Sequence, residues 1–226
     1  MSRNNDLERL YKILNDLKSR TGFRYLNNSN GRMNWPNQGV YFFFEDGELR
    51  EETGELRVVR VGTHAVSQGS QTTLWKRLIQ HRGTMTGSGN HRGSIFRLHT
   101  GTAIIARDNL MCDTWGIGGN ATQKIKRAEQ PIELLVSRQI GAMPFLWIKA
   151  EDKAGPQSIR KYIERNTIAL LSNYHKTALD KPSTNWLGHY CANRLVRESG
   201  LWNVDHVADG YNPDFLEKLE QLMNQM

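Results

Sequence analysis

Two short apolar segments separated by a polar stretch place the strongest constraint on the fold of this chain. Residues 40–44 are β-branched and aromatic, and residues 57–61 alternate apolar and basic side chains. Both compositions favour strands. The charged, glycine-containing residues between them are typical of a turn. The sequence therefore predicts an antiparallel hairpin with a long polar connection, and residues 143–150 (MPFLWIKA) predict a third strand.

Helical periodicity marks most of the remaining chain. Residues 5–20 carry apolar side chains at i, i+3, i+4 and i+7, the pattern of an amphipathic helix. Further helices are predicted at 71–81, 94–107, 132–140, 158–173, 188–198 and 213–224, with Pro131 opening the one at 132–140. Residues 83–92 and 108–128 are expected to form loops. The predicted class is α+β, with a small antiparallel three-stranded sheet flanked by helices.

Composition excludes several classes of protein. The chain has 226 residues, enough to bury a core without disulfides or metals. Its two cysteines, Cys112 and Cys191, are too few for a disulfide framework and lack zinc-type spacing. No uncharged run approaches the roughly 18–20 residues that span a bilayer, and the first ten residues lack the apolar core of a secretory signal. We expect a cytoplasmic protein with no membrane partner.

The positive charge is unevenly distributed. The formal net charge is +7, from 30 Lys and Arg against 23 Asp and Glu. Residues 57–107 contain no carboxylate and eight basic residues, namely Arg57, Arg60, Lys76, Arg77, Arg82, Arg92, Arg97 and Arg107. A segment of one sign indicates a polyanion partner, because each neutralised phosphate releases condensed counterions. A solvated basic face is the alternative interpretation.

Several short motifs follow one another on the predicted elements. The first strand contains Gly39-Val40-Tyr41, the second ends Arg60-Val61-Gly62, the next helix carries Arg77 with His81 at i+4, and the late helix carries Glu164. In this order the motifs resemble the GIY-YIG nuclease superfamily, and the histidine one turn after the arginine resembles its restriction-enzyme-like branch. The P-x-x-N element of the family would be Pro182-Ser183-Thr184-Asn185, with Asn173 as a rival for Asn185.

The resemblance implies a metal-dependent DNA endonuclease. Glu164 would hold one divalent ion, Mg²⁺ or Mn²⁺, since Mg²⁺ suits one carboxylate with phosphate oxygens and waters. Arg77 would clamp the phosphate. Tyr41 would orient or deprotonate the attacking water, His81 would share proton transfer, and Asn185 would orient one of these groups.

Arg60 departs from the family pattern, because it stands where the family has the first tyrosine of YIG. An arginine stays protonated and cannot serve as a base. It is a candidate for the cation that would allow Tyr41 to act as one. His64 follows the second strand closely and is a candidate for a substitute base.

Each of these residues also has a structural interpretation. Tyr41 in an aromatic strand is by default a core residue, and Arg77 with His81 could form a solvated helix face. Glu164 could pair with Arg165 at the surface, where an ion pair contributes little. Asn185 could cap the helix that follows.

The domain organisation is expected to be one domain, 1–226. It comprises an N-terminal helix and loop (1–36), a GIY-YIG-like core (37–85 and 143–187), an insertion (86–142) and a C-terminal helical extension (188–226). In and beside the insertion, candidate DNA-binding residues are Lys76, Arg82, Asn90, Arg92 and Arg97. Arginine suits phosphates and guanine edges, and asparagine suits adenine. The alternative is an ordinary helical subdomain packed on the sheet.

The expected function is hydrolysis of phosphodiester bonds in double-stranded DNA, serving restriction or defence against foreign DNA. Cutting both strands with one site per chain would favour a homodimer. Three alternatives remain open. The chain could be a DNA-binding module without catalysis, with Arg60 marking the loss, a structure-specific DNA repair nuclease, or an RNA-processing enzyme.

Overall fold

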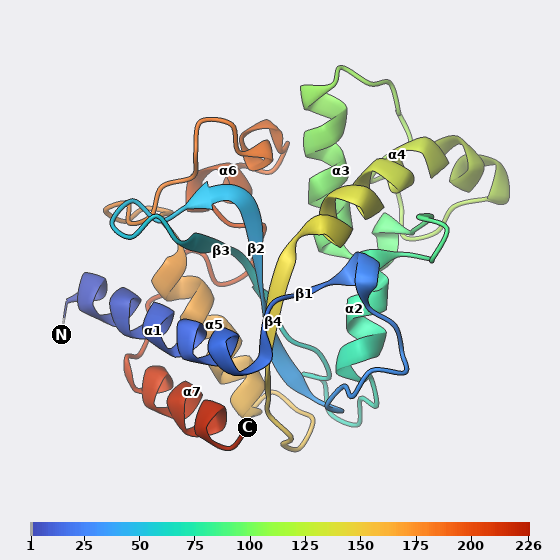
Figure 1. Cartoon of the computed structure of the whole chain (residues 1–226). Coiled ribbons are helices and arrows are strands. Elements are labelled where there is room, and N and C mark those ends of the chain that lie inside the picture. The colour runs from blue at the N-terminus through green and yellow to red at the C-terminus, as the bar shows by residue number, and fades with distance from the viewer. Residues whose placement is uncertain (1) are drawn as a thin grey trace.

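The computed structural model describes residues 2–226 and has an antiparallel sheet between two layers of helices (Figure 1). The strands are β1 (Arg24–Tyr25), β2 (Gly39–Leu49), β3 (Leu56–Gly62) and β4 (Pro144–Lys149). The α-helices are α1 (Arg3–Thr21), α2 (Leu74–Arg82), α3 (Ile95–Arg107), α4 (Gln123–Ala142), α5 (Ile159–Leu171), α6 (Arg194–Ser199) and α7 (Asp214–Asn224). Short 3-10 helices are η1 (Leu26–Asn28), η2 (His91–Gly93) and η3 (Leu187–Tyr190). The predicted α+β class is confirmed.

The sheet has four strands in the order β1-β4-β2-β3 rather than the predicted three. The additional strand is the two-residue β1, in which Arg24 pairs with Phe145 and Tyr25 with Pro144. Two residues are too few to show the alternation by which a strand is predicted, so the sequence indicated only a loop there. In the described part of the chain, no helix is long and apolar enough to cross a membrane.

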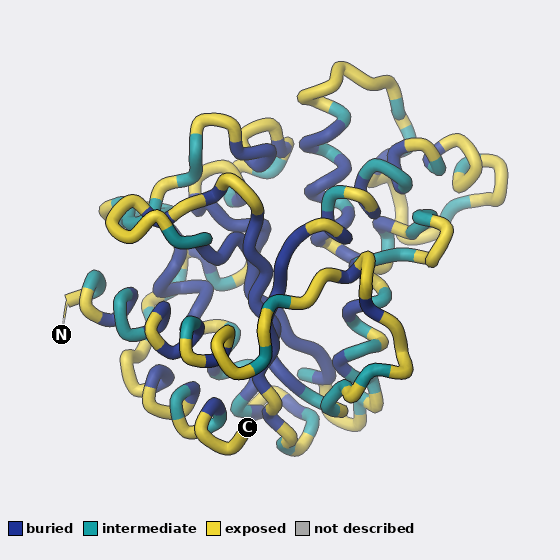
Figure 2. The backbone as a smooth tube through the Cα atoms, viewed as in Figure 1, coloured by how far each residue is buried: buried dark blue, intermediate teal, exposed yellow. Residues whose placement is uncertain are grey.

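Alternation along β2 divides the core into two parts. Val40, Phe42 and Phe44 pack with α1, α5 and α7, whereas Tyr41 and Phe43 pack with α2, α3 and α4. Successive side chains of a strand point to opposite faces, so a strand covered on both sides is apolar throughout. Figure 2 shows the central strands and the inner sides of the helices buried and the outer turns exposed. This is why residues 40–44 form a continuous apolar run.

The β2–β3 ladder has a bulge directly beside Arg60. Phe43 pairs with Arg60 but Phe44 pairs with Val58, so Val59 is the additional residue. Bulges re-aim side chains and are frequent beside active sites. Arg60 lies on the same face as Tyr41 and Phe43 because it is the direct partner of Phe43, on the unshifted side of the bulge.

Helix α4 begins at Gln123, with Thr122 as its N-cap, and contains Pro131 within it. The prediction that Pro131 opens this helix is therefore wrong. Proline interrupts a helix because it lacks an N–H and clashes with the preceding turn. Here the turns on both sides are held from outside, because Glu129 and Glu133 bond to residues of η2 and α3.

Buried ion pairs join the two helices of the insertion. The Arg97 guanidinium is fully buried and donates to the Glu133 carboxylate at 2.5 Å, and the Arg92 side chain, 5% exposed, donates to Glu129 at 2.6 Å. The structure corrects the expectation that these arginines contact DNA, because each is enclosed by protein and bonded to a carboxylate. The basic stretch of the sequence is thus partly neutralised by acids about forty residues later, at positions 129 and 133.

Replacing Arg97 by alanine is predicted to lower the free energy of unfolding by about 3–5 kcal/mol, since the Glu133 carboxylate would be left buried without its cation. Although burial favours protonation, hydrogen bonds from His91 and the charge of Arg97 hold the pKa of Glu133 below its usual value. The pairing therefore contributes above the ordinary glutamate pKa, and the difference between the two proteins should shrink as the pH falls through the lower, folded-state pKa.

Denaturant unfolding at neutral and acid pH measures this difference. The matched control is Arg138→Ala, because Arg138 lies exposed on the same helix α4, and a change there is expected to stay within about 0.5 kcal/mol of the parent. Equal stability of the Arg97 variant and the control would contradict the structural role.

Candidate active site

The ring of Tyr41 lies directly over Gly62 of the neighbouring strand. The two residues are partners in the β2–β3 register. A Cβ atom placed on Gly62 would lie 2.2 Å from the Tyr41 hydroxyl and 2.3 Å from Cζ, closer than real Cβ contacts come. A glycine at the end of β3 is therefore required for the tyrosine to lie flat across the strand.

The Tyr41 hydroxyl begins a buried chain of hydrogen bonds. It lies 2.7 Å from Nε2 of His81, and Nδ1 of His81 lies 2.8 Å from Oγ of Ser94. All three residues are buried. Ser94 is also the N-cap of α3, because its Oγ accepts from the Arg97 amide. The insertion thus supplies the residue that orients the ring of His81.

Burial lowers the pKa of His81 well below its usual value, and the charges of Arg77, Arg60 and Arg97 lower it further. The ring is therefore neutral, with one N–H and one lone pair. In the tautomer protonated at Nδ1, that nitrogen donates to Ser94 and Nε2 accepts from Tyr41. In this arrangement the Tyr41 hydroxyl is the donor, and the lone pairs of its oxygen are not used by the bond to His81.

Arg60 is a buried cation on the same face as Tyr41. Its Nη1 donates to the carbonyl of Trp202 at 2.5 Å, and its guanidinium lies 4.7 Å from the ring centroid of Phe96. Burial lowers the pKa of Arg60 overall, and the proximity of Tyr41 and Glu164 opposes part of this shift. Within residues 2–226, Nε of Arg60 has no hydrogen-bond partner. Arg60, a cation whose Nε–H is not bonded within the described chain, therefore occupies the position at which the family pattern has the first tyrosine of YIG.

Helix α5 carries Glu164 to the end of β3. One turn before it, Arg160 binds the carbonyl of His64 and the carboxylate of Asp152, which fixes the start of the helix against the chain that leaves β3. Oε1 of Glu164 accepts from the Thr63 amide at 3.0 Å. Burial raises the pKa of Glu164, although the cation of Arg60 opposes the rise.

Arg77 completes the cluster from α2. Its half-buried side chain donates to Gln80 at 2.8 Å and lies 3.4 Å from the carbonyl of Gly93. Its charge lowers the pKa of His81 and opposes the rise in the pKa of Glu164, so it lies within electrostatic range of both. The early arginine and the late carboxylate thus share one region at the end of the sheet.

Asn185 does not join this cluster. It is exposed in the turn between Ser183, which binds Glu48, and Trp186, which binds Glu45. Both glutamates lie in the second half of β2, beyond Tyr41. The rival Asn173 is also occupied, since its Oδ1 accepts from the Leu179 amide. The P-x-x-N match therefore does not bring an asparagine to the site.

The asparagine beside the site is Asn203, which no sequence motif indicated. Its amide accepts from the Val61 N–H at 3.0 Å and donates to the Val61 carbonyl at 2.9 Å. Trp202, the residue before it, donates its amide to Val59. These bonds close the outer edge of β3 and hold Arg60 between two fixed neighbours. The bare pattern Trp-Asn offered no signal for this role.

A histidine of the same C-terminal loop also lies near the carboxylate. The charge of His206 opposes the rise in the Glu164 pKa. His206 has a positive φ of 65°, and its Nδ1 lies 2.9 Å from Asp209, which binds Arg165 next to Glu164. The loop is therefore tied to α5 at the turn that carries the carboxylate.

His64 has a buried nitrogen without a partner in the described chain, Nε2. Its Nδ1 lies 2.9 Å from the carbonyl of Thr72. Burial lowers the pKa of His64 to about 4, so the ring is neutral and the proton is on Nδ1, because a carbonyl only accepts. Nε2 thus keeps a free lone pair, as a substitute base would require.

The remaining candidates for DNA contact differ in exposure. Lys76 is exposed on α2. Arg82 is held by the carbonyl of Ser29 at 2.8 Å and covers the ring of Trp75. The exposed Asn90 caps η2 with its own side chain. Lys76 is the one of these three with no side-chain bond in the described structure.

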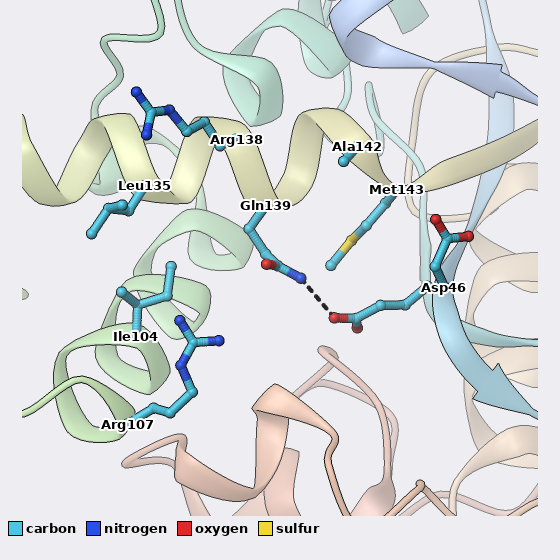
Figure 3. Close-up of a pocket in the computed structure, with 9 residues that line it drawn as sticks. Asp46, Ile104, Arg107, Leu135, Arg138, Gln139, Ala142 and Met143 are labelled. Atoms are coloured by element: carbon cyan, nitrogen blue, oxygen red, sulfur yellow. Dashed lines mark hydrogen bonds between the residues drawn. The ribbon is translucent and has the colours of Figure 1, made fainter.

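A separate cavity of about 330 Å³ lies between α3, α4 and β2 (Figure 3). Arg107 and Arg138 lie on its two helical walls, and Gln139 bonds across it to Glu45 at 2.8 Å. Because its strand residues are Glu45 and Asp46, it lies beyond Tyr41 along β2. It contains none of the clustered site residues.

Replacement of Gly62 by alanine is predicted to abolish the function of the site, because the new Cβ would displace the Tyr41 ring from His81. The matched control is Gly155→Ala, since a Cβ there meets nothing within 4 Å. Activity measured beside the melting temperature tests this. If Gly62→Ala and Gly155→Ala are equally active, Tyr41 does not need its present position.

The whole chain, residues 1–226, matches the family model of the GIY-YIG domain. The match includes the insertion and both terminal extensions. No curated protein and no solved structure matches the sequence. Members of the family are endonucleases and generally use divalent metal ions. The cluster at the end of the sheet comprises Tyr41, Arg60, Arg77, His81 and Glu164, at the positions expected from the motifs. The chain therefore belongs to the GIY-YIG nuclease superfamily.

Proposed function

We propose that the protein is a divalent-metal-dependent DNA endonuclease of the restriction-enzyme-like branch, acting on double-stranded DNA in restriction or defence. The observation that carries this proposal is the bond between Tyr41 and His81 beside Arg60, Arg77 and Glu164. The resemblance to this branch rests on an arginine with a histidine at i+4. These two residues, Arg77 and His81, both belong to the candidate site.

The donor set suits a hard cation that keeps most of its ligands from water and substrate. Glu164 uses one oxygen for the Thr63 amide, and no bond of its second oxygen is seen within residues 2–226. The described residues contain no group of three or more His, Cys, Asp or Glu that could hold an ion alone. One carboxylate with phosphate oxygens and waters is the coordination that Mg²⁺ accepts. An ion held by Glu164 would act as a Lewis acid on the scissile phosphate.

The cations of the site would bind and polarise the phosphate. Arg77 is half-exposed, so its guanidinium can donate two parallel hydrogen bonds to phosphate oxygens. Arg60 is buried with a free Nε–H. Fixed donors in a site of low dielectric stabilise charge that develops in the transition state.

Proton transfer would begin at Tyr41. Tyr41 would accept the proton of the attacking water as a tyrosinate, after its own hydroxyl proton has left to solvent. The neutral ring of His81 would then donate from Nε2 to the tyrosinate oxygen while Nδ1 accepts from Ser94, which fixes the lone pair that faces the water. The positive charge of Arg60 would stabilise negative charge on the tyrosine oxygen. Because the cations around His81 oppose its protonation, the ring orients the tyrosine rather than storing the proton. If each chain has one such site, a homodimer would cut both strands.

A second candidate function is a DNA-binding module on the same scaffold without catalysis. The observation that favours it is Arg60, which replaces the tyrosine of the family pattern. Such a module would show salt-dependent binding to DNA with no cleavage in Mg²⁺ or Mn²⁺.

Glu164→Ala and Arg77→Ala are each expected to abolish Mg²⁺-dependent nicking of plasmid DNA, because one removes the metal ligand and the other the phosphate clamp. The matched control is Glu217→Ala, a change at an exposed glutamate of α7, which should nick at the parental rate. Agarose-gel assays with circular dichroism melting separate loss of chemistry from loss of fold. Parental rates in both site variants would disprove the site assignment.

Tyr41→Phe is expected to lower the cleavage rate by about 10²–10⁴-fold, the usual contribution of general acid–base catalysis. His64→Gln is expected to cut at nearly the parental rate, because Tyr41 rather than His64 faces the attacking water in this proposal. Single-turnover cleavage over a range of pH distinguishes them. The opposite ranking of the two variants would identify His64 as the base.

A further inference from the structure

We propose that the first turns of α4 and the loop before them form a second DNA-binding surface, which holds the backbone of the duplex beyond the point where it is cut. We call it the arm surface and define it by Met111, Ile117, Lys124, Lys126 and Arg127. This inference rests on the proposed DNA substrate and adds to it where the duplex runs. It replaces the expected contacts of Arg92 and Arg97, which are buried.

The arm surface carries cations that other protein groups leave free. Lys124, Lys126 and Arg127 are exposed. No side-chain hydrogen bond or ion pair of theirs is found within residues 2–226. The acids that follow on the same helix, Glu129 and Glu133, are bonded to arginines of the neighbouring segment. Three positive charges therefore remain for a partner.

These cations do not serve the stability of the helix. Positive side chains in the first turns of a helix are unfavourable, because the N-terminal end of the helix dipole is itself positive. Lys124, Lys126 and Arg127 all lie within the first five residues of α4. A polyanion is the partner that would make the arrangement favourable.

The loop that leads into α4 also exposes large apolar side chains. Met111 is 87% exposed and Ile117 is 66% exposed, although the same loop buries Trp115 to 8%. Apolar side chains beside cations are typical of surfaces that contact the sugars and grooves of DNA. Asp113 is an exposed acid of the loop, so the cations outnumber it.

The arm surface is connected with the active site along the protein surface. A cavity of about 290 Å³ lies between the start of α3 and the loop, lined by residues that include Gly93, Ile95, Gly116, Gly118 and Gly119. Arg77 of the active site lies against the carbonyl of Gly93 at one side of this cavity. The loop continues from Gly119 into α4, whose first turns project away from the sheet (Figure 1). A backbone bound at Arg77 can therefore extend over the glycines to the arm surface.

The test compares two triple variants that lose the same charge. K124A/K126A/R127A removes the cations of the arm surface. K12A/K181A/K218A removes three exposed cations elsewhere, on α1, in the segment between α5 and η3 and on α7. Fluorescence anisotropy with a labelled duplex in EDTA measures the dissociation constant at several salt concentrations, and plasmid nicking in Mg²⁺ is measured separately.

The arm variant should bind the duplex at least about tenfold more weakly than the control triple. Its plot of log affinity against log salt should be less steep by about 0.9 for each phosphate that the variant no longer neutralises. M111S/I117S should bind more weakly with an unchanged slope, because it removes no charge. All variants should melt like the parent, since the altered residues are exposed.

Equal affinity and slope for the arm variant and the control triple would overturn the inference, even if the parent nicks plasmid and the proposed function stands. Weaker binding of the arm variant to an RNA duplex but not to DNA would also overturn it. A parent that binds but never cuts would disprove the nuclease activity, while the comparison of triples would still decide the arm surface. A parent that neither binds nor cuts DNA would overturn both.

Discussion

The pairing of Tyr41 with Gly62 is the contact on which the rest of the site depends. It places an aromatic side chain across the end of β3, where only a residue without Cβ leaves room. The same register pairs Phe43 with Arg60 and so places Arg60 on the same face. One strand pair thus positions Tyr41 and the cation of Arg60, and α2 and α5 bring their side chains to the same end of the sheet.

The insertion helps to hold the candidate site rather than being a separate addition to it. Ser94 bonds the ring of His81, and Arg97 donates to the backbone carbonyl of His81 at 2.8 Å. Arg97 is itself held by Glu133. A buried ion pair is costly to desolvate, and in some proteins it is retained because it imposes one geometry. Here the geometry is that of the helix that carries Arg77 and His81.

Much of the fold could be predicted because its signals are local. Apolar alternation and helical periodicity located the three long strands and the helices around them. The prediction was wrong where local preference is overridden, as at Pro131, which lies inside a helix held by outside contacts. It was also wrong for β1, a strand too short to have a pattern.

By itself, the sequence determined the residue types of the site and their order, because the motifs lie on elements with strong periodicity. Only the tertiary structure decided which charged side chains are paired with protein groups. Arg92 and Arg97 resemble free cations in the sequence but meet glutamates from another helix, whereas Asn203 reaches Val61 from across the chain. Such pairings join residues far apart along the chain, and no local pattern encodes the distance between them.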